Sequence, residues 1–350
     1  MVVALIDMDY FFGACEELRH HELKGKPFVV GTSPEKDKMK GVVQTANYEA
    51  RKYGIKSGIS TVQAYRLYKD LIYLQEDYDY YESVSKKIFA LLLSYHKPVE
   101  QMSIDEFAID FGKDTSYHEA ELLAMEFKER INKEIGLPCT VGISYGKVFA
   151  KMVCDSAKPN GFKTVKEEDI WNFLEDKSVG ELPGIGVKTE EKLKEMGIAK
   201  IGELAKVNPL VLEEKFGSFG IEMHELANGI DKSKVIERYE VLSISRESTL
   251  EEPTKDLGKI KSKLKELSED VKKEIDKNGY VFKTIGVKVR YSDFSGAIKN
   301  KSMERYSNSG ELIFETACKL IELLVEGKEV RKVGVRVSSF SGGPGQRKLF

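Results

Sequence analysis

The sequence lacks any long hydrophobic run, and this absence excludes several classes of protein. No stretch of the 350 residues approaches the roughly 20 apolar residues that a membrane-spanning helix needs. No signal peptide precedes the first apolar run, because Asp7 interrupts that run too early. We therefore expect a soluble protein of the cytoplasm that has no contact with a membrane.

Cysteine is also scarce, with only four in the chain. The four are scattered, and their spacing matches no metal-binding motif. They are Cys15, Cys139, Cys154 and Cys318. Because disulfides are rare in the cytoplasm, we interpret them as reduced thiols of the hydrophobic core.

A near balance of charge over the whole chain hides an asymmetry between its two ends. The net charge is −2, yet residues 241–350 carry 22 Lys and Arg against 16 Asp and Glu, a local charge of +6. Residues 1–240 therefore carry −8. A chain of this length should hold two or more domains. A basic C-terminal domain indicates a polyanionic partner.

The most informative stretch is 102–110, where two carboxylates stand side by side in an apolar, strand-like run. Asp105 and Glu106 are costly there unless a hairpin tip or a cation accepts them. The apolar run 2–6 is a second strand, and it delivers Asp7. The simplest account places the two strands side by side, with Asp7, Asp105 and Glu106 around hard divalent cations. Oxygen ligands without nearby His or Cys suit Mg²⁺, and two such ions are the usual clamp for phosphoryl transfer.

Around these strands the hydrophobic pattern alternates between strand and helix. Helices are predicted at 77–95 and 119–135, and a further strand at 140–144. The order β–α–β–β–α–β from residue 1 to 144, with an insert at 11–76, predicts a ferredoxin-like domain.

Three side chains near these elements are candidates for phosphate binding. Tyr48 and Arg51 lie three residues apart and share a helix face, where the guanidinium could fork onto phosphate oxygens. A surface cation beside a packed aromatic is the alternative, which the residues alone favour. Lys158 follows a helix predicted at 148–157 and could meet a phosphate or act as a basic C-cap. Asp9 is a candidate N-cap of the first helix.

The stretch Leu-Pro-Gly-Ile-Gly at 182–186 predicts a tight turn between two helices. Gly184 and Gly186 are followed by Lys188, in a pattern that matches a helix–hairpin–helix motif. Such a turn exposes backbone N–H groups at a helix N-terminus, which grip a phosphate without reading a base. The alternative is a plain helix turn.

A polar segment at 229–239 predicts a linker, and a second β–α–β–β–α–β unit follows it. Two of its strands separate apolar from basic residues on alternate faces. The apolar face holds Ile285, Val287, Val289, Val333, Val335 and Val337, and the basic face holds Lys288, Arg290, Lys332 and Arg336. Two helices can cover only the apolar face. An open basic face fits a nucleic-acid backbone, and the alternative is solvent-facing charge that keeps a sheet soluble.

Six short motifs in this order resemble one known family. They are Asp7-Met8-Asp9-Tyr10-Phe11-Phe12, Ala46-Asn47-Tyr48-Glu49-Ala50-Arg51, Ser103-Ile104-Asp105-Glu106, Gly142-Ile143-Ser144, Ala157-Lys158-Pro159-Asn160-Gly161 and Pro183-Gly184-Ile185-Gly186. Their order and spacing resemble a Y-family DNA polymerase of the DNA polymerase IV (DinB-like) branch, archaeal in character. The resemblance covers nearly the whole chain.

The resemblance implies an α+β multidomain fold shaped as a right hand. Its parts would be a ferredoxin-like palm, small fingers, a helical thumb with the helix–hairpin–helix, a linker, a βαββαβ little finger and a flexible tail. The palm would occupy residues 1–10 and 77–165, the fingers 11–76 and the thumb 166–231. The linker would occupy 232–240, the little finger 241–341 and the tail 342–350. The implied activity is template-directed addition of deoxynucleotides to a primer 3′ end, including opposite damaged bases. We expect a monomer with low processivity and fidelity, and no proofreading, since no exonuclease-like carboxylate cluster is visible.

The resemblance also implies roles for individual residues. Asp7, Asp105, Glu106 and the Met8 carbonyl would hold two Mg²⁺ ions. The deoxynucleoside triphosphate would meet Thr45, Tyr48, Arg51, Lys158 and backbone groups of Tyr10, Phe11 and Phe12. Phe12 would be the steric gate against a ribose 2′-OH. Many relatives have Tyr in place of Phe12, and Gly13 replaces a common Ala, which would loosen that turn.

The last residues resemble a peptide that binds a sliding clamp. Gln346, Leu349 and Phe350 follow the glycine-rich stretch 342–345. A disordered tail is the alternative. Two other functions are weighed against a polymerase. A palm-fold nucleotidyl cyclase needs neither a helix–hairpin–helix nor a basic second domain, and a noncatalytic DNA-binding scaffold would not need three intact carboxylates.

Overall fold

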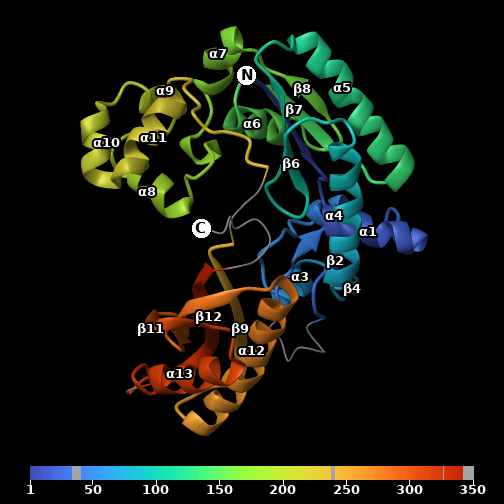
Figure 1. Cartoon of the computed structure of the whole chain (residues 1–350). Coiled ribbons are helices and arrows are strands. Elements are labelled where there is room, and N and C mark those ends of the chain that lie inside the picture. Colours follow the sequence, from blue (N-terminus) through green and yellow to red (C-terminus); the bar gives the residue numbers. More distant parts are fainter. Residues whose placement is uncertain (34–40, 238–240, 326, 342–350) are drawn as a thin grey trace. The chain divides into compact units, whose positions relative to one another are not determined.

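The computed structural model describes residues 1–33, 41–237, 241–325 and 327–341. The chain divides into two compact units, Met1–Glu237 and Arg238–Phe350 (Figure 1). Among the described residues, no helix is both long enough and apolar enough to cross a membrane. All four cysteines are free thiols, as expected, and three of them are buried, whereas Cys318 is only half-buried.

The first unit is built on a five-stranded sheet in the order β5-β6-β1-β7-β8. The strands are β1 (Val2–Asp7), β5 (Val99–Gln101), β6 (Glu106–Gly112), β7 (Thr140–Ser144) and β8 (Phe162–Thr164). With the helices α4 (Tyr78–Leu93) and α5 (Tyr117–Arg130), the first four strands form the predicted ferredoxin-like arrangement. The helical run 131–135 extends α5. The strand β8, which pairs parallel to β7, was not predicted.

The central strand β1 is buried over its whole length because both faces of the sheet are covered. Alternate residues point to opposite faces. Ala4 and Ile6 pack into the core that α4 and α5 complete. Val3 and Leu5 pack against Ala150 of the helix α6 (Lys147–Ala157) on the other face. This two-sided packing brings α6 close to the C-terminal end of β1.

The insert between β1 and α4 forms a small separate core around the sheet β3-β2-β4. Its strands are β2 (Phe28–Val30), β3 (Thr45–Ala46) and β4 (Ile72–Leu74), and its helical segments are α1 (Phe11–Arg19), η1 (His21–Leu23), α2 (Tyr48–Arg51) and α3 (Thr61–Leu67). Asn47 is the N-cap residue of α2, and its side-chain oxygen accepts hydrogen bonds from the backbone N–H groups of Ala50 and Phe28. This cap ties the short helix α2 to β2.

The rest of the first unit is helical and has its own core. Its segments are η3 (Glu167–Asp169), α7 (Ile170–Leu174), η4 (Val179–Glu181), α8 (Val187–Glu195), α9 (Ile201–Leu204), α10 (Pro209–Phe216) and α11 (Ser218–Ala227). Residues 232–237 were predicted to be linker, and in the structure they lie against the sheet domain. The backbone N–H of Ile236 donates to Glu100 at 2.6 Å, and Val235 packs on the α6 side of the sheet.

The second unit contains β9 (Ser243–Thr254), α12 (Leu257–Asn278), β10 (Val281–Tyr291), β11 (Gly296–Ser307), α13 (Gly310–Glu322) and β12 (Val330–Ser341). The predicted element order is confirmed. The strand order β11-β10-β12-β9 differs from that of the first sheet, because here the last strand, rather than the first, lies inside the sheet. The predicted apolar face is buried beneath α12 and α13.

Candidate active site

The ends of β1 and β6 bring Asp7 and Glu106 together. The strands are antiparallel, and these two residues are direct partners in the register. The backbone N–H of Met8 donates to the carbonyl of Asp105 at 3.0 Å, which continues the pairing by one residue. Asp7 is only 2% exposed. The predicted adjacency of the two carboxylate-bearing strands is therefore confirmed.

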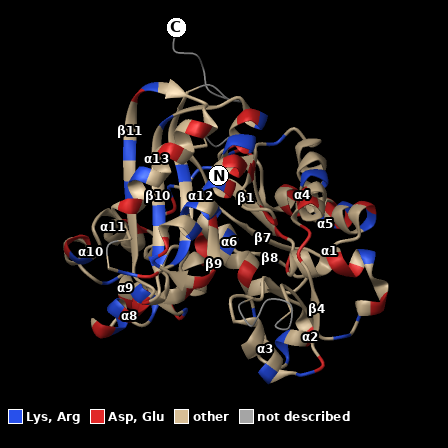
Figure 2. Cartoon of the chain, turned by 90° about the horizontal axis from the view of Figure 1, so that it is seen from below, with Lys and Arg blue, Asp and Glu red and all other residues tan. Residues whose placement is uncertain are grey.

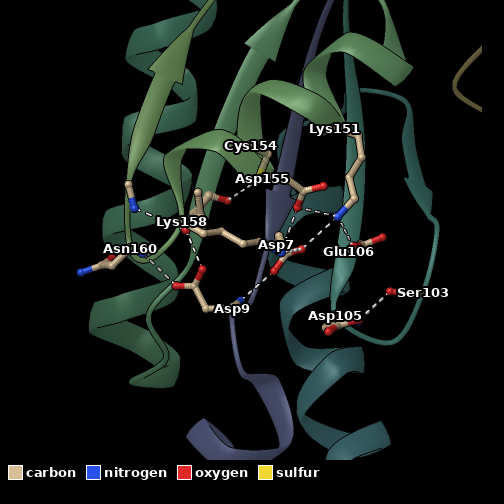
Figure 3. A network of polar contacts seen from close by, with 12 residues as sticks. Asp7, Asp9, Ser103, Asp105, Glu106, Lys151, Cys154, Asp155, Lys158 and Asn160 are labelled. Atoms are coloured by element: carbon tan, nitrogen blue, oxygen red, sulfur yellow. Dashed lines mark hydrogen bonds and ion pairs between the residues drawn. The ribbon is translucent and has the colours of Figure 1, made fainter. Parts of the chain in front are cut away.

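Asp105 does not converge with the other two carboxylates. Its Oδ1 accepts a hydrogen bond of 2.6 Å from the Ser103 hydroxyl, and Figure 3 shows the side chain turned toward that residue. Burial raises the pKa of the carboxyl groups of Asp105 and Glu106. Within the described ranges, no three His, Cys, Asp or Glu side chains form a ready metal site. Of the three carboxylates predicted to bind metal, only Asp7 and Glu106 are therefore brought together in this structure.

Two lysines of α6 and the loop after it occupy the space beside Asp7 (Figure 3). The Nζ of Lys158 lies 2.5 Å from Asp7 Oδ2, and the Nζ of Lys151 lies 3.3 Å from the same oxygen. Lys151 also donates to Glu106 and contacts Asp155 at 3.0 Å. Burial opposes the charged form of Lys151, but the bond to Glu106 and the charge of Asp7 raise its pKa. Sequence reasoning missed Lys151, although it lies seven residues before Lys158.

This arrangement fits a hard cation. The Lys151 ammonium bridges a carboxylate of β1 and a carboxylate of β6, so a positive charge already stands between them. The donors are carboxylate oxygens, without histidine or thiolate, which is the chemistry that Mg²⁺ and similar ions select.

Asp9 is not a helix cap, contrary to the sequence interpretation. The N-cap residue of α1 is Tyr10, and Asp9 has a φ of 53°. Its two carboxylate oxygens accept hydrogen bonds from the Thr140 hydroxyl at 2.6 Å and from the backbone N–H of Asn160 at 3.0 Å. Asp9 therefore ties the end of β1 to the loop that carries Lys158.

Tyr48 and Arg51 lie on the same side of α2, as their spacing predicted. The guanidinium of Arg51 stacks 4.7 Å from the centre of the Tyr48 ring, and its Nε donates to the carbonyl of Ala46. The Tyr48 hydroxyl is buried and has no hydrogen-bond partner among the residues that the structure describes. Burial raises the pKa of the Tyr48 hydroxyl, and the charges of Asp9 and Lys158 are close enough to affect that pKa. A hydroxyl without a partner among the described residues, close to Lys158, favours the phosphate-binding interpretation of Tyr48 over the interpretation as a packed aromatic. Thr45 begins β3 and is half-buried.

An aromatic wall from α4 supports Phe12. The rings of Phe12 and Tyr81 stack with centroids 4.5 Å apart and planes at 15°, and Tyr78 meets Phe12 edge-on at 5.7 Å. Tyr81 is fully buried, and its hydroxyl donates to Glu16 at 2.7 Å. Phe11 is buried in the core, so only its backbone can face a ligand. Both supporting tyrosines were missed in the sequence, where 78–81 is visibly rich in aromatics.

Gly13 leaves room for the ring of Tyr10. A Cβ at Gly13 would lie 2.8 Å from Cδ2 of Tyr10, whose hydroxyl donates to Glu17 at 2.9 Å. Alanine at this position would push the ring away, and the glycine thus allows close packing at the start of α1.

Comparison with known proteins identifies this arrangement. Residues 6–155 match the impB/mucB/samB family, and residues 241–349 match the C-terminal domain of that family. DNA polymerase IV of Methanoculleus marisnigri is 37% identical over 98% of this chain and 95% of its own length. The chain belongs to the Y family of DNA polymerases, in the DNA polymerase IV (DinB-like) branch.

Solved structures of Y-family polymerases agree with this assignment. The Y-family DNA polymerase chimera of Dbh and Dpo4 is 30% identical, with a TM-score of 0.91 over 98% of this chain and 100% of its own. The insertion ternary complex of Dbh DNA polymerase is also 30% identical, with a TM-score of 0.69 over 97% and 98% of the two chains. The chain is therefore a translesion DNA-directed DNA polymerase that uses DNA and nucleotides as substrates and depends on a divalent metal. These matches exclude the alternative function of a palm-fold nucleotidyl cyclase.

The thumb of the polymerase contains the predicted phosphate-binding turn. Residues 180–231 match the DNA polymerase-iota thumb domain. Gly184 has a φ of 94°, and Gly186 caps the N-terminus of α8 without a side-chain hydrogen bond. The turn joins the single 3₁₀ turn η4, rather than a full helix, to α8. Lys188 is exposed in the first turn of α8.

The little finger of the polymerase presents the predicted basic face. Lys288, Arg290 and Arg336 are exposed and Lys332 is half-buried, on the side of the sheet opposite the apolar core. Figure 2 shows Lys and Arg along β10 and β11. Sequence reasoning missed Glu247 of β9, which pairs with both Lys288 and Lys332. The proposed clamp-binding residues Gln346, Leu349 and Phe350 lie outside the described residues.

Proposed function

We propose that Asp7, Asp105, Glu106 and the backbone carbonyl of Met8 hold two Mg²⁺ ions, with which the polymerase adds deoxynucleotides to a primer 3′ end. The observation that carries this proposal is the pairing of Asp7 with Glu106 around a bridging ammonium. When bound, the ions would lower the pKa of the primer hydroxyl and neutralise charge on the α-phosphate. For this set to close, Asp105 turns away from Ser103, and the ammonium of Lys151 withdraws.

The incoming triphosphate is proposed to meet Tyr48, Arg51 and Lys158, together with Thr45 and backbone groups of Tyr10, Phe11 and Phe12. The unpartnered Tyr48 hydroxyl and the nearby guanidinium supply a hydrogen bond and a charge-assisted fork. Lys158 would exchange its contact with Asp7 for a phosphate oxygen. Phe12, supported by Tyr81, would occupy the space that a ribose 2′-OH needs.

Primer–template DNA is proposed to bind through its phosphates at two surfaces. In the thumb, the backbone at Gly184 and Gly186 and the side chain of Lys188 would grip one strand. In the little finger, Lys288, Arg290, Lys332 and Arg336 would neutralise the backbone without reading bases. Both modes are indifferent to sequence, which suits a polymerase that must accept damaged templates.

The proposal extends to the organisation of the chain. Residues 1–10 and 77–165 would be the palm, 11–76 the fingers, 166–231 the thumb, 232–240 the linker, 241–341 the little finger and 342–350 the tail. We further propose a monomer of the cytoplasm, with low processivity and fidelity, no proofreading, and a sliding clamp as partner of the tail.

Primer extension tests the catalytic assignment. We expect Asp105→Ala and Glu106→Ala each to abolish nucleotide addition while primer–template affinity stays near that of the wild type, since the DNA is held elsewhere. Asp110→Asn is the matched control, because Asp110 lies on β6 with Glu106 and its side chain accepts a hydrogen bond from the backbone N–H of Gly112. Near-normal extension by either alanine variant would exclude the metal assignment of that residue.

A further inference from the structure

The carboxylate of Glu247 lies among the cations of the basic face of the little finger. The Oε1 of Glu247 lies 2.9 Å from the Nζ of Lys288, and its Oε2 lies 2.6 Å from the Nζ of Lys332. The side chain of Glu247 is 25% exposed, less than either lysine. Two of the four cations proposed to bind DNA are therefore paired within the protein.

The backbone is arranged to allow this contact. Glu247 on β9 and Lys288 on β10 are both register partners of Gly334, on the strand between them. A Cβ on Gly334 would lie 2.5 Å from the Cγ of Glu247. Only glycine at this position lets the glutamate lie across β12 and reach a lysine two strands away. Lys332, two residues along β12 from Gly334, points to the same face.

The carboxylate is ionised in this setting. The hydrogen bond from Lys332, joined by that from Lys288, holds the pKa of Glu247 below its usual value, although burial opposes this. The three side chains together carry a charge of +1. Without the carboxylate, two ammonium groups would face the solvent with their full charge.

We propose that Glu247 is a built-in counter-ion that weakens the grip of the little finger on the DNA backbone. This inference rests on the proposed role of Lys288 and Lys332 in binding DNA phosphates. A phosphate that approaches the sheet competes with Glu247 for both ammonium groups and is repelled by the carboxylate itself. DNA is therefore released more readily, which limits the number of nucleotides added in each encounter.

The variant Glu247→Gln of the full chain tests this proposal, because it keeps the shape of the side chain and removes its charge. Binding of a fluorescent primer–template duplex is measured by anisotropy over a series of salt concentrations. We expect binding about two- to fivefold tighter near ~0.1 M salt. The slope of log affinity against log salt should steepen by up to about one. Weaker binding would show that Glu247 positions the lysines, and unchanged binding would show that it is a spectator. Either result overturns the proposal.

Two further variants separate the sources of failure. Glu252→Gln removes an exposed charge from the same strand and should leave the slope unchanged, which excludes a general effect of net charge. In the background Lys288→Gln, Lys332→Gln, the change at Glu247 should lose its effect. If that double variant binds DNA like the wild type, the proposed role of this face fails. If the double variant weakens binding while Glu247→Gln changes nothing, only the counter-ion inference fails.

Discussion

The ammonium of Lys158 lies 2.5 Å from the Oδ2 of Asp7, so a residue proposed to bind the triphosphate is paired with one proposed to bind metal. Lys151 contacts the same oxygen. The two lysines supply the positive charge that the buried Asp7 requires. On the proposed assignments, binding of metal and of nucleotide would be coupled through Asp7, because each would displace an ammonium from it.

Lys151→Met should make the protein less stable without metal and more responsive to metal. The ammonium compensates Asp7 and Glu106, so its removal should lower the free energy of unfolding by about 1–3 kcal/mol in the presence of a chelator. Since Mg²⁺ then competes with Lys158 alone rather than with two ammonium groups, the rise in melting temperature on adding Mg²⁺ should exceed that of the wild type. Differential scanning calorimetry with and without Mg²⁺ measures both quantities.

Lys147→Met is the matched control for this experiment. Lys147 is on the same helix and is paired with the buried Glu100 at 2.8 Å, away from Asp7. Its loss should lower stability equally with and without Mg²⁺. If Lys151→Met behaves in the same way, Lys151 is a structural cation and does not compete with metal.

Phe12→Ala should admit ribonucleotides. The ring is held against Tyr81 and cannot turn aside without losing that stack, so its removal relieves a clash with the 2′-OH. We expect the efficiency ratio of ribo- to deoxynucleotide incorporation to rise about 10- to 100-fold in steady-state kinetics. Phe12→Tyr, which keeps the bulk, should leave the ratio low. If the alanine variant has the same ratio as the wild type, Phe12 is a packing residue and the steric gate lies elsewhere.

Neutralising the basic face should flatten the salt dependence of DNA binding. Each phosphate contact contributes a slope of about −0.9 to log affinity against log salt. Replacing Lys288, Arg290, Lys332 and Arg336 together by Gln should reduce the slope and the number of nucleotides added per encounter. Measurements on two unrelated duplex sequences should agree, since no base is read. A slope identical to that of the wild type would assign these residues to solubility.

Deleting Gln346–Phe350 should remove stimulation by a sliding clamp and leave basal synthesis intact. The tail would act by raising the effective concentration of the polymerase at the primer end, not by changing the chemistry. The single-turnover incorporation rate should therefore be the same with and without the tail. Isothermal titration calorimetry with the clamp is the direct measurement, and equal affinity of the full and truncated chains would place the contact on the folded domains.

Apart from β8, the sequence alone was sufficient for the order of the elements in both sheet domains and for the meeting of Asp7 with Glu106. Apolar periodicity depends on residues close together in the chain, and it identified β1, β6 and β7 and the separation of faces on β10 and β12. The turn at Gly184, which is proposed to bind phosphate, was visible for the same reason, because its conformation is encoded within a few residues.

Only the tertiary structure decided which charges meet. Lys151 reaches Asp7 and Glu106 across 144 and 45 residues of chain. Glu247 reaches Lys288 because β12 lies between their strands and carries a glycine there. Strand order of this kind depends on how whole elements pack, and no local pattern records it. The two β–α–β–β–α–β units make this plain, since the same succession of elements builds two different sheets.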